Sequence, residues 1–517
     1  MSTDKALVSI HPTGEQKNAS IMAPKRAVEL ETYGGKVHVE WDPQAAVTPL
    51  GQLPFFIDFL KTAELFDPWV SDCPLDYKSP NAPKKVEVLG TLVLSVLAGH
   101  FRYAHINTVR CDGVNPELLG MNKVASEDSV RRAFLHMNED AAIKWLQDHL
   151  MRCYGPLLYE PWILDIDSSV KPLYGHQEGA VVGYNPQKFG RPSHVFHTYM
   201  MANTRLVLDV ETRQGNQTAA LYTRPGLWAL LRHMPREAWP KFLRGDCAWG
   251  NEGAMSEAEE NDMPYLFKLK QSQKVKDFIA TLFWADEWIP VGQGWEGIEG
   301  NVQLDGWTKS RRAIAMRRRI RSDVVAQKKE KKLLGQKEFV FMDPQDRKYE
   351  YAVLVTSLDD EIEVLVQHYR DRADAENNFD ELKNQWGWCG YTTHDIKRCG
   401  IISRIIALVY NWWTLFTRLA IPSKHAEAIT SRPLLMHAIG RQTKHAGQTT
   451  ITITSMHAKA GKVQRCLTSL ERFLREIKTS AEQLTWLERW RKILSRIFVW
   501  FLKGRPLAVP KLQLNSV

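Results

Sequence analysis

The chain has 517 residues, of which 44% are hydrophobic, so it can form roughly two to four domains with large cores. Its 68 Lys and Arg residues exceed its 59 Asp and Glu residues, and the net charge of +9 indicates an anionic partner. Seven scattered cysteines without a CxxC pair argue against a zinc module and a secreted disulfide framework, so we expect a reducing cytoplasm.

Residues 1–36 are polar and aperiodic, and we expect them to be mobile. Residues 37–155 are expected to be mainly helical and to bind DNA, with helices over 53–66 and 86–100. Ser126 is a predicted helix cap, and the segment 116–137 has the outline of a helix-turn-helix. An ordinary helical hairpin fits that outline equally well, so the DNA-end reader stays open between this segment and the strands N-terminal to it.

Strand signals begin at Trp162 and define the first part of a core over residues 156–271. The run "WILDID" alternates, which places Asp165 and Asp167 on one face of a strand. Two more strands follow at 194–201 and 205–212, then a helix at 219–233. A short strand at 241–246 ends at Asp246, and another spans 265–270. The sequence therefore predicts strand, hairpin, helix, strand, strand.

Residues 272–359 differ in composition from the preceding core, because they combine Trp, Gly, basic residues and short β runs. This composition predicts a β-rich insertion. Eleven Lys and Arg residues lie between Lys309 and Lys332. A solvated loop could look like this, but a surface that follows DNA phosphates is the preferred interpretation. In the alternating run 311–321, Arg317, Arg319 and Arg321 share a face and are predicted to bind DNA.

The last part of the core is expected at 360–420, and its first helix is predicted over 367–386, where no Pro or Gly occurs. At about 100° per residue, an arc of about 60° holds Tyr369, Arg372, Glu376 and Lys383. An apolar stripe adjoins this arc, whereas Asn378 and Glu381 are assigned to other, wetter directions. A charged solvated face is the ordinary interpretation of such a helix, and the stripe alone does not exclude it.

Residues 421–517 are predicted to be helical. Apolar residues recur at four-three spacing in two stripes, Val463, Leu467, Leu470, Leu474 and Ile477, then Leu487, Trp490, Leu494 and Ile497. Core packing is the expected role of both stripes, with a dimerisation surface as the alternative. The most apolar runs, 88–99 and 405–417, are shorter than the about 20 residues that span a bilayer, so no membrane partner is expected.

The predicted order of elements is that of a ribonuclease H-like α/β core with a β-rich insertion and helical flanks. In that arrangement the first and fourth strands bring Asp167 and Asp246 side by side, and a packed helix can add Glu376. Three crowded carboxylates repel one another unless they hold divalent cations. Two Mg²⁺ ions about 4 Å apart can then support an in-line phosphoryl displacement.

The spacing Tyr369-x2-Arg372-x3-Glu376-x6-Lys383 resembles the Y-R-E-K signature of DDE transposases from bacterial insertion sequences. Residues 164–194 and 244–253 resemble the segments around that family's first and second Asp, and the likeness covers about residues 40–420. The resemblance implies metal-dependent cutting at the element's terminal inverted repeats, followed by joining of the 3′-hydroxyl ends to target DNA. It also implies duplex DNA as partner, a homodimer on paired ends, and a bacterial, nucleoid-associated location.

By the same resemblance, Asp167, Asp246 and Glu376 are the catalytic and metal-binding acids, with Asp165 as the fallback for the first. The ions implied are two Mg²⁺, with Mn²⁺ as a substitute. Phosphates near the cleaved end would be gripped by Tyr369, Arg372 and Lys383. An aromatic of the insertion would stack on a flipped base, and the candidates are Trp295 and Trp307.

Two other functions remain as alternatives: an inactive DNA-binding repressor or structural factor, and a ribonuclease H-type nuclease without strand joining. The intact set of acids argues against the repressor, and the insertion and long flanks argue against the nuclease.

Overall fold

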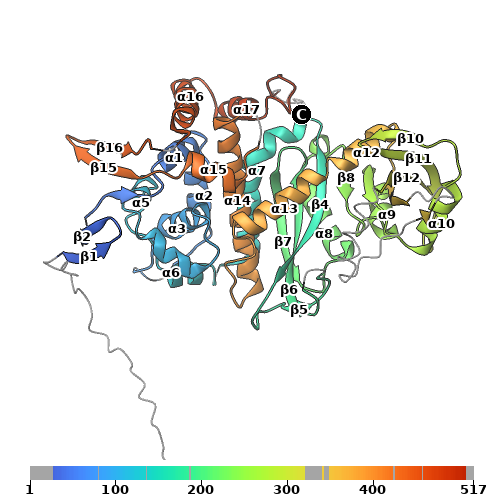
Figure 1. Ribbon diagram of the computed structural model, residues 1–517, viewed down its shortest axis with the longest axis horizontal. Helices are drawn as coiled ribbons and strands as arrows, with labels where there is room; N and C mark the ends of the chain where they lie inside the picture. The colour runs from blue at the N-terminus through green and yellow to red at the C-terminus, as the bar shows by residue number, and fades with distance from the viewer. Residues whose placement is uncertain are drawn as a thin grey trace, which may run out of the picture.

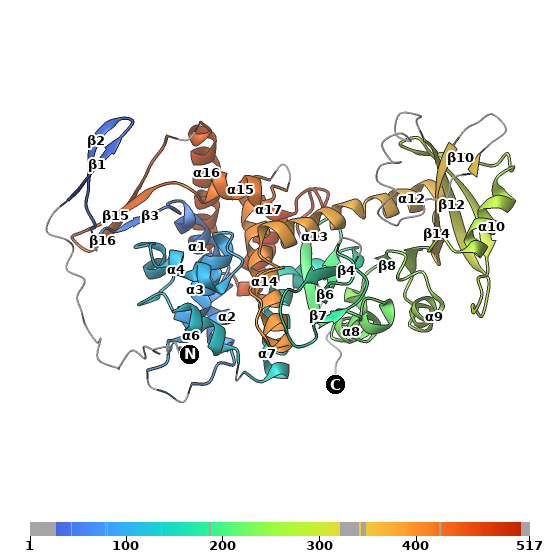
Figure 2. The same ribbon diagram turned by 60° about the horizontal axis from the view of Figure 1, so that its bottom comes forward.

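The computed structural model describes residues 27–507 apart from 43, 78, 80, 136, 186–187, 321–340, 343–347, 423–424 and 457. A mixed sheet of eleven strands runs through the middle of the molecule. A helical part, built from both ends of the described chain, lies at one end of this sheet, and a β-rich lobe lies at the other (Figures 1 and 2). The protein is therefore a mixed α/β chain whose sheet joins two dissimilar parts.

Five strands form the middle of the sheet, in the order β7, β6, β4, β8, β9. Their bounds are β4 Ile163–Pro172, β6 Pro192–Met201, β7 Leu206–Gln214, β8 Phe242–Gly245 and β9 Tyr265–Lys268. β4, β8 and β9 are parallel, whereas β6 and β7 are antiparallel to their neighbours. In chain order this is 3-2-1-4-5, which is consistent with the expected ribonuclease H-like core.

Two helices interrupt these strands, the expected α8 (Ala220–Arg232) and an unpredicted α9 (Glu252–Glu260). The Asn251 side chain accepts a hydrogen bond from the Ala254 backbone N–H and so caps α9. A short strand, β5 (Val181–Val182), pairs with the outer part of β6.

The insertion continues the core sheet instead of forming a separate one. β14 (Lys348–Thr356) pairs antiparallel with β9, and beyond it lie β12 (Arg311–Arg319), β11 (Trp295–Val302) and β10 (Ile289–Gly292). β13 (Phe341–Met342) pairs with β14. The β-rich expectation is confirmed except for α10 (Gln273–Leu282), a helix capped by the Ser272 side chain.

The helical part is centred on α14 (Ile396–Ala420), which packs against β7 together with α7 (Glu139–Tyr154). α14 is longer than the apolar run seen in the sequence, and by length and composition it could cross a membrane. Its whole apolar window is buried inside the protein, so core packing accounts for its hydrophobicity.

Short helices complete the N-terminal part: α1 Leu53–Thr62, α2 Phe66–Asp72, α3 Lys85–Leu97, α4 Ile106–Val109, α5 Asn115–Leu118 and α6 Glu127–Ala133. Single 3₁₀ turns occupy Tyr103–His105, Gly155–Tyr159 and Arg236–Ala238. Ser126 caps α6 as predicted, by accepting from the Ser129 backbone N–H. The predicted helix-turn-helix is reduced, however, because α5 is a single turn and α6 ends at Ala133.

At the C-terminal end, α15 (Ala428–Leu435), α16 (Ala460–Thr479) and α17 (Trp486–Ile497) are helical as expected. The first apolar stripe is entirely buried, and in the second only Leu487 is exposed.

Two hairpins were not predicted. β15 (Gly440–His445) pairs with β16 (Gln448–Ile453) on one side and with β3 (Val47–Thr48) on the other. β1 (Val28–Thr32) pairs with β2 (Gly35–Val39), and this hairpin begins within the segment expected to be mobile. Residues 1–26 lie outside the described residues.

The helix predicted over 367–386 is broken into α12 (Ile362–Arg370) and α13 (Ala373–Gln385). In a continuous helix the Arg372 N–H would donate to the His368 carbonyl oxygen. That oxygen instead accepts from the Arg244 guanidinium, and the Arg372 N–H turns to the Tyr369 carbonyl at 3.2 Å. A contact with a residue more than a hundred positions away therefore ends α12, which no local pattern could indicate.

Candidate active site

Asp167 lies within β4, and Asp246 directly follows the neighbouring parallel strand β8. In the register of β4 and β8, Ile166 is opposite Gly245, and each aspartate is the next residue along its strand. The Asp167 carboxylate accepts from its own strand, at the Ser168 N–H (2.7 Å), and Asp246 accepts from the Ala248 N–H (2.9 Å). The strand pairing thus places the two predicted acids side by side.

Glu376 reaches the same place from the first turn of α13. Arg372, the residue before this helix, donates from Nη2 to Asp167 Oδ2 at 2.6 Å and from Nη1 to Glu376 Oε1 at 2.8 Å. One guanidinium therefore joins two of the three predicted acids. Arg372 is buried, whereas the Glu376 side chain is about two-thirds exposed, at 65%.

The electrostatics of Asp167 reflect this crowding. The pKa of Asp167 is raised to about 6, chiefly by burial; the Arg372 guanidinium and the Ser168 N–H oppose this rise, whereas Asp246 and Glu376 add to it. Asp246 and Glu376 are thus close enough to act on the charge of Asp167. A cation at this position would relieve the repulsion, and the Arg372 guanidinium supplies positive charge there.

Asp165, the fallback for the first acid, has a different partner. Its two carboxylate oxygens accept from Arg244 Nε and Nη2 at 2.5 and 2.7 Å, and both residues are almost completely buried. In such a bidentate pair both oxygens of the carboxylate are occupied by the guanidinium. Arg244 was not among the predicted site residues. Its position two residues before Asp246, on a predicted core strand, indicated a buried cation that needs a carboxylate partner.

No group of three His, Cys, Asp or Glu side chains stands ready to hold a metal ion anywhere in the described ranges. The donor chemistry at Asp167, Asp246 and Glu376 nevertheless suits Mg²⁺, because it consists of carboxylate oxygens that face an accessible surface. The Arg372 guanidinium lies between two of these acids, so they can converge on an ion once it moves away.

The predicted stripe spans two helices, because Tyr369 lies in α12, Arg372 directly precedes α13, and Glu376 and Lys383 lie in α13. Tyr369 and Arg372 line a cavity of about 220 Å³ together with Glu376 and Lys268. Lys383 is half-buried about two turns beyond Glu376 along α13. Lys268 was not predicted as a site residue, although it stands on a core strand next to the strand that leads to Asp246.

The two tryptophan candidates have different environments. Trp295 lines the same cavity as Glu376, and the Arg318 guanidinium lies 4.9 Å from the centre of its ring. Trp307 is buried in the core beside Arg311. Only Trp295 of this pair therefore faces the acids.

The part of the basic stretch that the structure describes, residues 309–320, is largely compensated within the protein. Arg317 pairs with Glu296 at 2.6 Å and lies over the rings of Trp288 and Tyr349, so its guanidinium is committed to the fold. Arg319 is exposed at the end of β12, and Arg321 lies outside the described residues. The alternating pattern of the sequence could not show that the sheet places Glu296 opposite Arg317.

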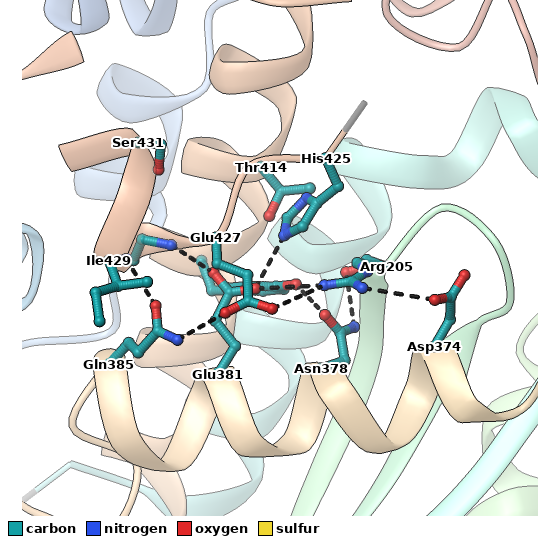
Figure 3. A network of polar contacts seen from close by, with 12 residues as sticks. Arg205, Asp374, Asn378, Glu381, Gln385, Thr414, His425, Glu427, Ile429 and Ser431 are labelled. Carbon is teal, nitrogen blue, oxygen red and sulfur yellow. Dashed lines mark hydrogen bonds and ion pairs between the residues drawn. The ribbon is translucent and has the colours of Figure 1, made fainter. Parts of the chain in front are cut away.

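A buried polar network fixes α13 from the side opposite Glu376 (Figure 3). Glu381 accepts from the Ala428 N–H and from His425 Nε2, both at 2.9 Å, and Arg205 Nη1 lies 3.7 Å away. Arg205 also approaches Asp374 at 3.6 Å. The assignment of Asn378 and Glu381 to a wet face was wrong, because helices α14 and α15 cover both side chains.

A family model described as "Transposase DDE domain group 1" matches residues 77–475. Among solved structures, a piggyBac transposase synaptic complex with hairpin DNA is similar, with a TM-score of 0.39 and 11% sequence identity over 91% of this chain and 88% of that chain. The search of curated proteins found no match.

Proposed function

The chain belongs to the family of transposases with a group 1 DDE domain, since that family's model matches well over half of its residues, and from this premise we propose that it cuts and joins DNA at the ends of a bacterial insertion sequence. The observation that carries the proposal is the position of the three acids. Asp167 on β4 and Asp246 directly after β8 each follow one of a pair of opposed residues on two neighbouring parallel strands, and Glu376 shares the Arg372 guanidinium with Asp167.

Asp167, Asp246 and Glu376 are the residues that would hold two Mg²⁺ ions, for which Mn²⁺ can substitute. When bound, such ions activate the attacking hydroxyl or water and stabilise the leaving oxygen of a phosphodiester. Asp165 is not needed for this role, because Arg244 already neutralises it.

The cationic residues would position the DNA strand. Arg372 leaves its carboxylate partners and donates its two N–H edges to a phosphate, while Lys383 and the exposed Arg319 add point charges. The Tyr369 hydroxyl, in the cavity beside Glu376, orients the same strand. Arg317 and Arg321 were predicted with this group, but Arg317 is already paired with Glu296.

Trp295 is the aromatic that we assign to base stacking near the cut end. It lines the cavity next to Glu376, whereas Trp307 is buried in the core. A flipped base stacked on Trp295 would leave its phosphate next to the acids. The protein would act as a homodimer on two element ends, in the bacterial cytoplasm at the nucleoid.

The test is DNA cleavage and joining by single alanine variants of Asp167, Asp246 and Glu376. The probe is a duplex that carries the inverted repeat bordering the gene, in the presence of Mg²⁺ or Mn²⁺. Each variant should lose cleavage by about 10³-fold or more while it still binds the duplex. The matched control is Asp380→Ala, which removes an exposed carboxylate from the same helix and should cleave normally.

Cleavage that survives Glu376→Ala would refute the assignment of the third acid. Duplex binding without cleavage by the wild-type protein, with either metal, would instead favour an inactive DNA-binding factor. Cleaved ends that never join a second duplex would favour a nuclease.

A further inference from the structure

A long segment between β4 and β6, residues 173–191, is held firmly by its backbone. The Leu173 N–H donates to the Pro192 carbonyl at 2.9 Å, and the Glu178 N–H donates to the His394 carbonyl at 2.7 Å. His194 Nε2 contacts the Glu178 carbonyl oxygen at 2.7 Å. Connections of this length are uncommon in compact domains unless they have a function.

Three large aromatic side chains of this segment are nevertheless exposed to solvent. The exposed fractions are 68% for Tyr174, 64% for Tyr184 and 72% for Phe189. Three large aromatic rings on one anchored loop contribute little to the core, and exposed apolar patches of this kind mark interaction surfaces. The rings are therefore available to a partner.

Two cations accompany the rings. Lys188 lies 5.0 Å and Arg191 4.8 Å from the centre of the Tyr174 ring, and Lys188 also contacts the Tyr174 hydroxyl. Within the part of the chain that the structure describes, neither cation has a carboxylate within 4.0 Å. By contrast, Arg312 and Arg317 of the insertion each pair with a glutamate. The charge of Lys188 and Arg191 is thus unused by the fold.

We propose that the loop surface, defined as Tyr174, Tyr184, Lys188, Phe189 and Arg191, binds DNA. Uncompensated cations fit phosphates, and exposed rings stack on bases or sugars. The loop follows the strand that carries Asp167, and at about 3.3 Å per residue Tyr174 lies at most about 23 Å from that acid. A duplex at the acids would reach the loop surface about seven base pairs from the cut.

This inference rests on the proposed function for its choice of partner, but its test needs no catalysis. Metal-free binding of two labelled 30-base-pair duplexes is measured as a function of salt: one cut from the DNA that borders the gene, the other of random sequence. In Lys188→Gln/Arg191→Gln, Kd should rise about ten-fold at 0.1 M salt, and the slope of log K against log salt should fall by about 1.8.

The matched control is Lys144→Gln/Arg475→Gln, which removes two equally exposed positive charges that already pair with Asp148 and Glu471. Its Kd should stay within about two-fold of wild type. A further variant, Phe189→Ala, should weaken binding without a change in salt slope, because stacking releases no counterions.

A loss confined to the bordering duplex places the loop surface on the element end, and an equal loss on both duplexes places it on sequence-independent or target DNA. An unchanged Kd for both duplexes in Lys188→Gln/Arg191→Gln, or an equal loss in the control, would overturn the proposal. Because every measurement is made on binding, failure of the proposed cleavage chemistry would leave this result intact.

Discussion

At the scale of single residues, the Arg372 guanidinium controls how the acids can be used. It contacts Asp167 and Glu376 in the described structure, so it competes with any cation for the same oxygens. A phosphate is an alternative partner for the same N–H groups. Binding of DNA and binding of metal should therefore favour one another, because each removes the other's competitor.

This coupling predicts the behaviour of Arg372→Ala. In this variant without DNA, the carboxylates of Asp167 and Glu376 lack their guanidinium partner. Mn²⁺ should therefore bind about ten-fold more tightly than to the wild-type protein, which corresponds to a coupling free energy of about 1.4 kcal/mol. Mn²⁺ binding followed by electron paramagnetic resonance or calorimetry measures this directly. In the wild-type protein, added duplex should raise Mn²⁺ affinity, whereas in the variant it should not.

Arg370→Ala is the matched control for that experiment, because Arg370 donates to the Gly292 carbonyl and to Gln367, not to the acids. Equal Mn²⁺ affinities for Arg372→Ala and the wild-type protein would show that Arg372 does not compete for the metal ligands.

The resemblance to the transposase family singled out Asp167, Asp246 and Glu376 in the sequence, and the structure brings Asp167 and Glu376 to the same guanidinium. Sequence reasoning could not tell how the acids are compensated. Arg244 and Asp165 pair across two strands, and this contact depends on a register that no local pattern contains. The same limit explains Arg317, whose glutamate partner comes from the neighbouring strand β11.

At the scale of elements, the pair of Asp165 and Arg244 connects the sheet to the end of α12. Arg244 holds both the Asp165 carboxylate and the His368 carbonyl oxygen, and the helix breaks at that point. α12 ends at Arg370 and α13 begins at Ala373. Because Glu376 lies in the first turn of α13, this pair helps to fix the position of Glu376. Its role is thus to position an element, not to bind a metal.

A double-mutant cycle tests that role. Asp165→Leu or Arg244→Met alone leaves a buried charge without its partner and should lower the free energy of unfolding by about 3–5 kcal/mol. The pair Asp165→Leu/Arg244→Met removes both charges and should cost clearly less than the sum of the singles. Urea unfolding followed by circular dichroism gives these values. Strictly additive costs would show that the two residues do not act together.

The elements themselves were predictable to different degrees. The core strands and α8 follow from period-two alternation and helix periodicity, and the structure has them within a few residues. The insertion was recognised by composition, but its continuation of the core sheet through β14 and β9 is a pairing between segments about 85 residues apart. The hairpin of β1 and β2 carried a local signal, alternation around Gly34 and Gly35, that the polarity of the segment obscured.

At the scale of the whole molecule, both ends of the described chain build one helical part. α16 packs against α1 and α14, and α17 packs against α14, so the C-terminal helices close a core that begins near residue 50. The apolar stripe of α16 is buried within the chain. It is consequently not free to serve as a dimerisation surface, and two copies would have to associate through other residues.

Substitutions in that stripe distinguish core packing from association. Leu470→Ala and Leu474→Ala remove fully buried side chains and should each lower the free energy of unfolding by about 2–5 kcal/mol. Arg472→Ala, which alters an exposed side chain between them, should stay within about 0.5 kcal/mol of wild type. Unfolding midpoints in urea should not depend on protein concentration, because the contacts are within one chain. Midpoints that rise with concentration in the wild-type protein, and lose that dependence in Leu470→Ala, would instead place the stripe between two copies.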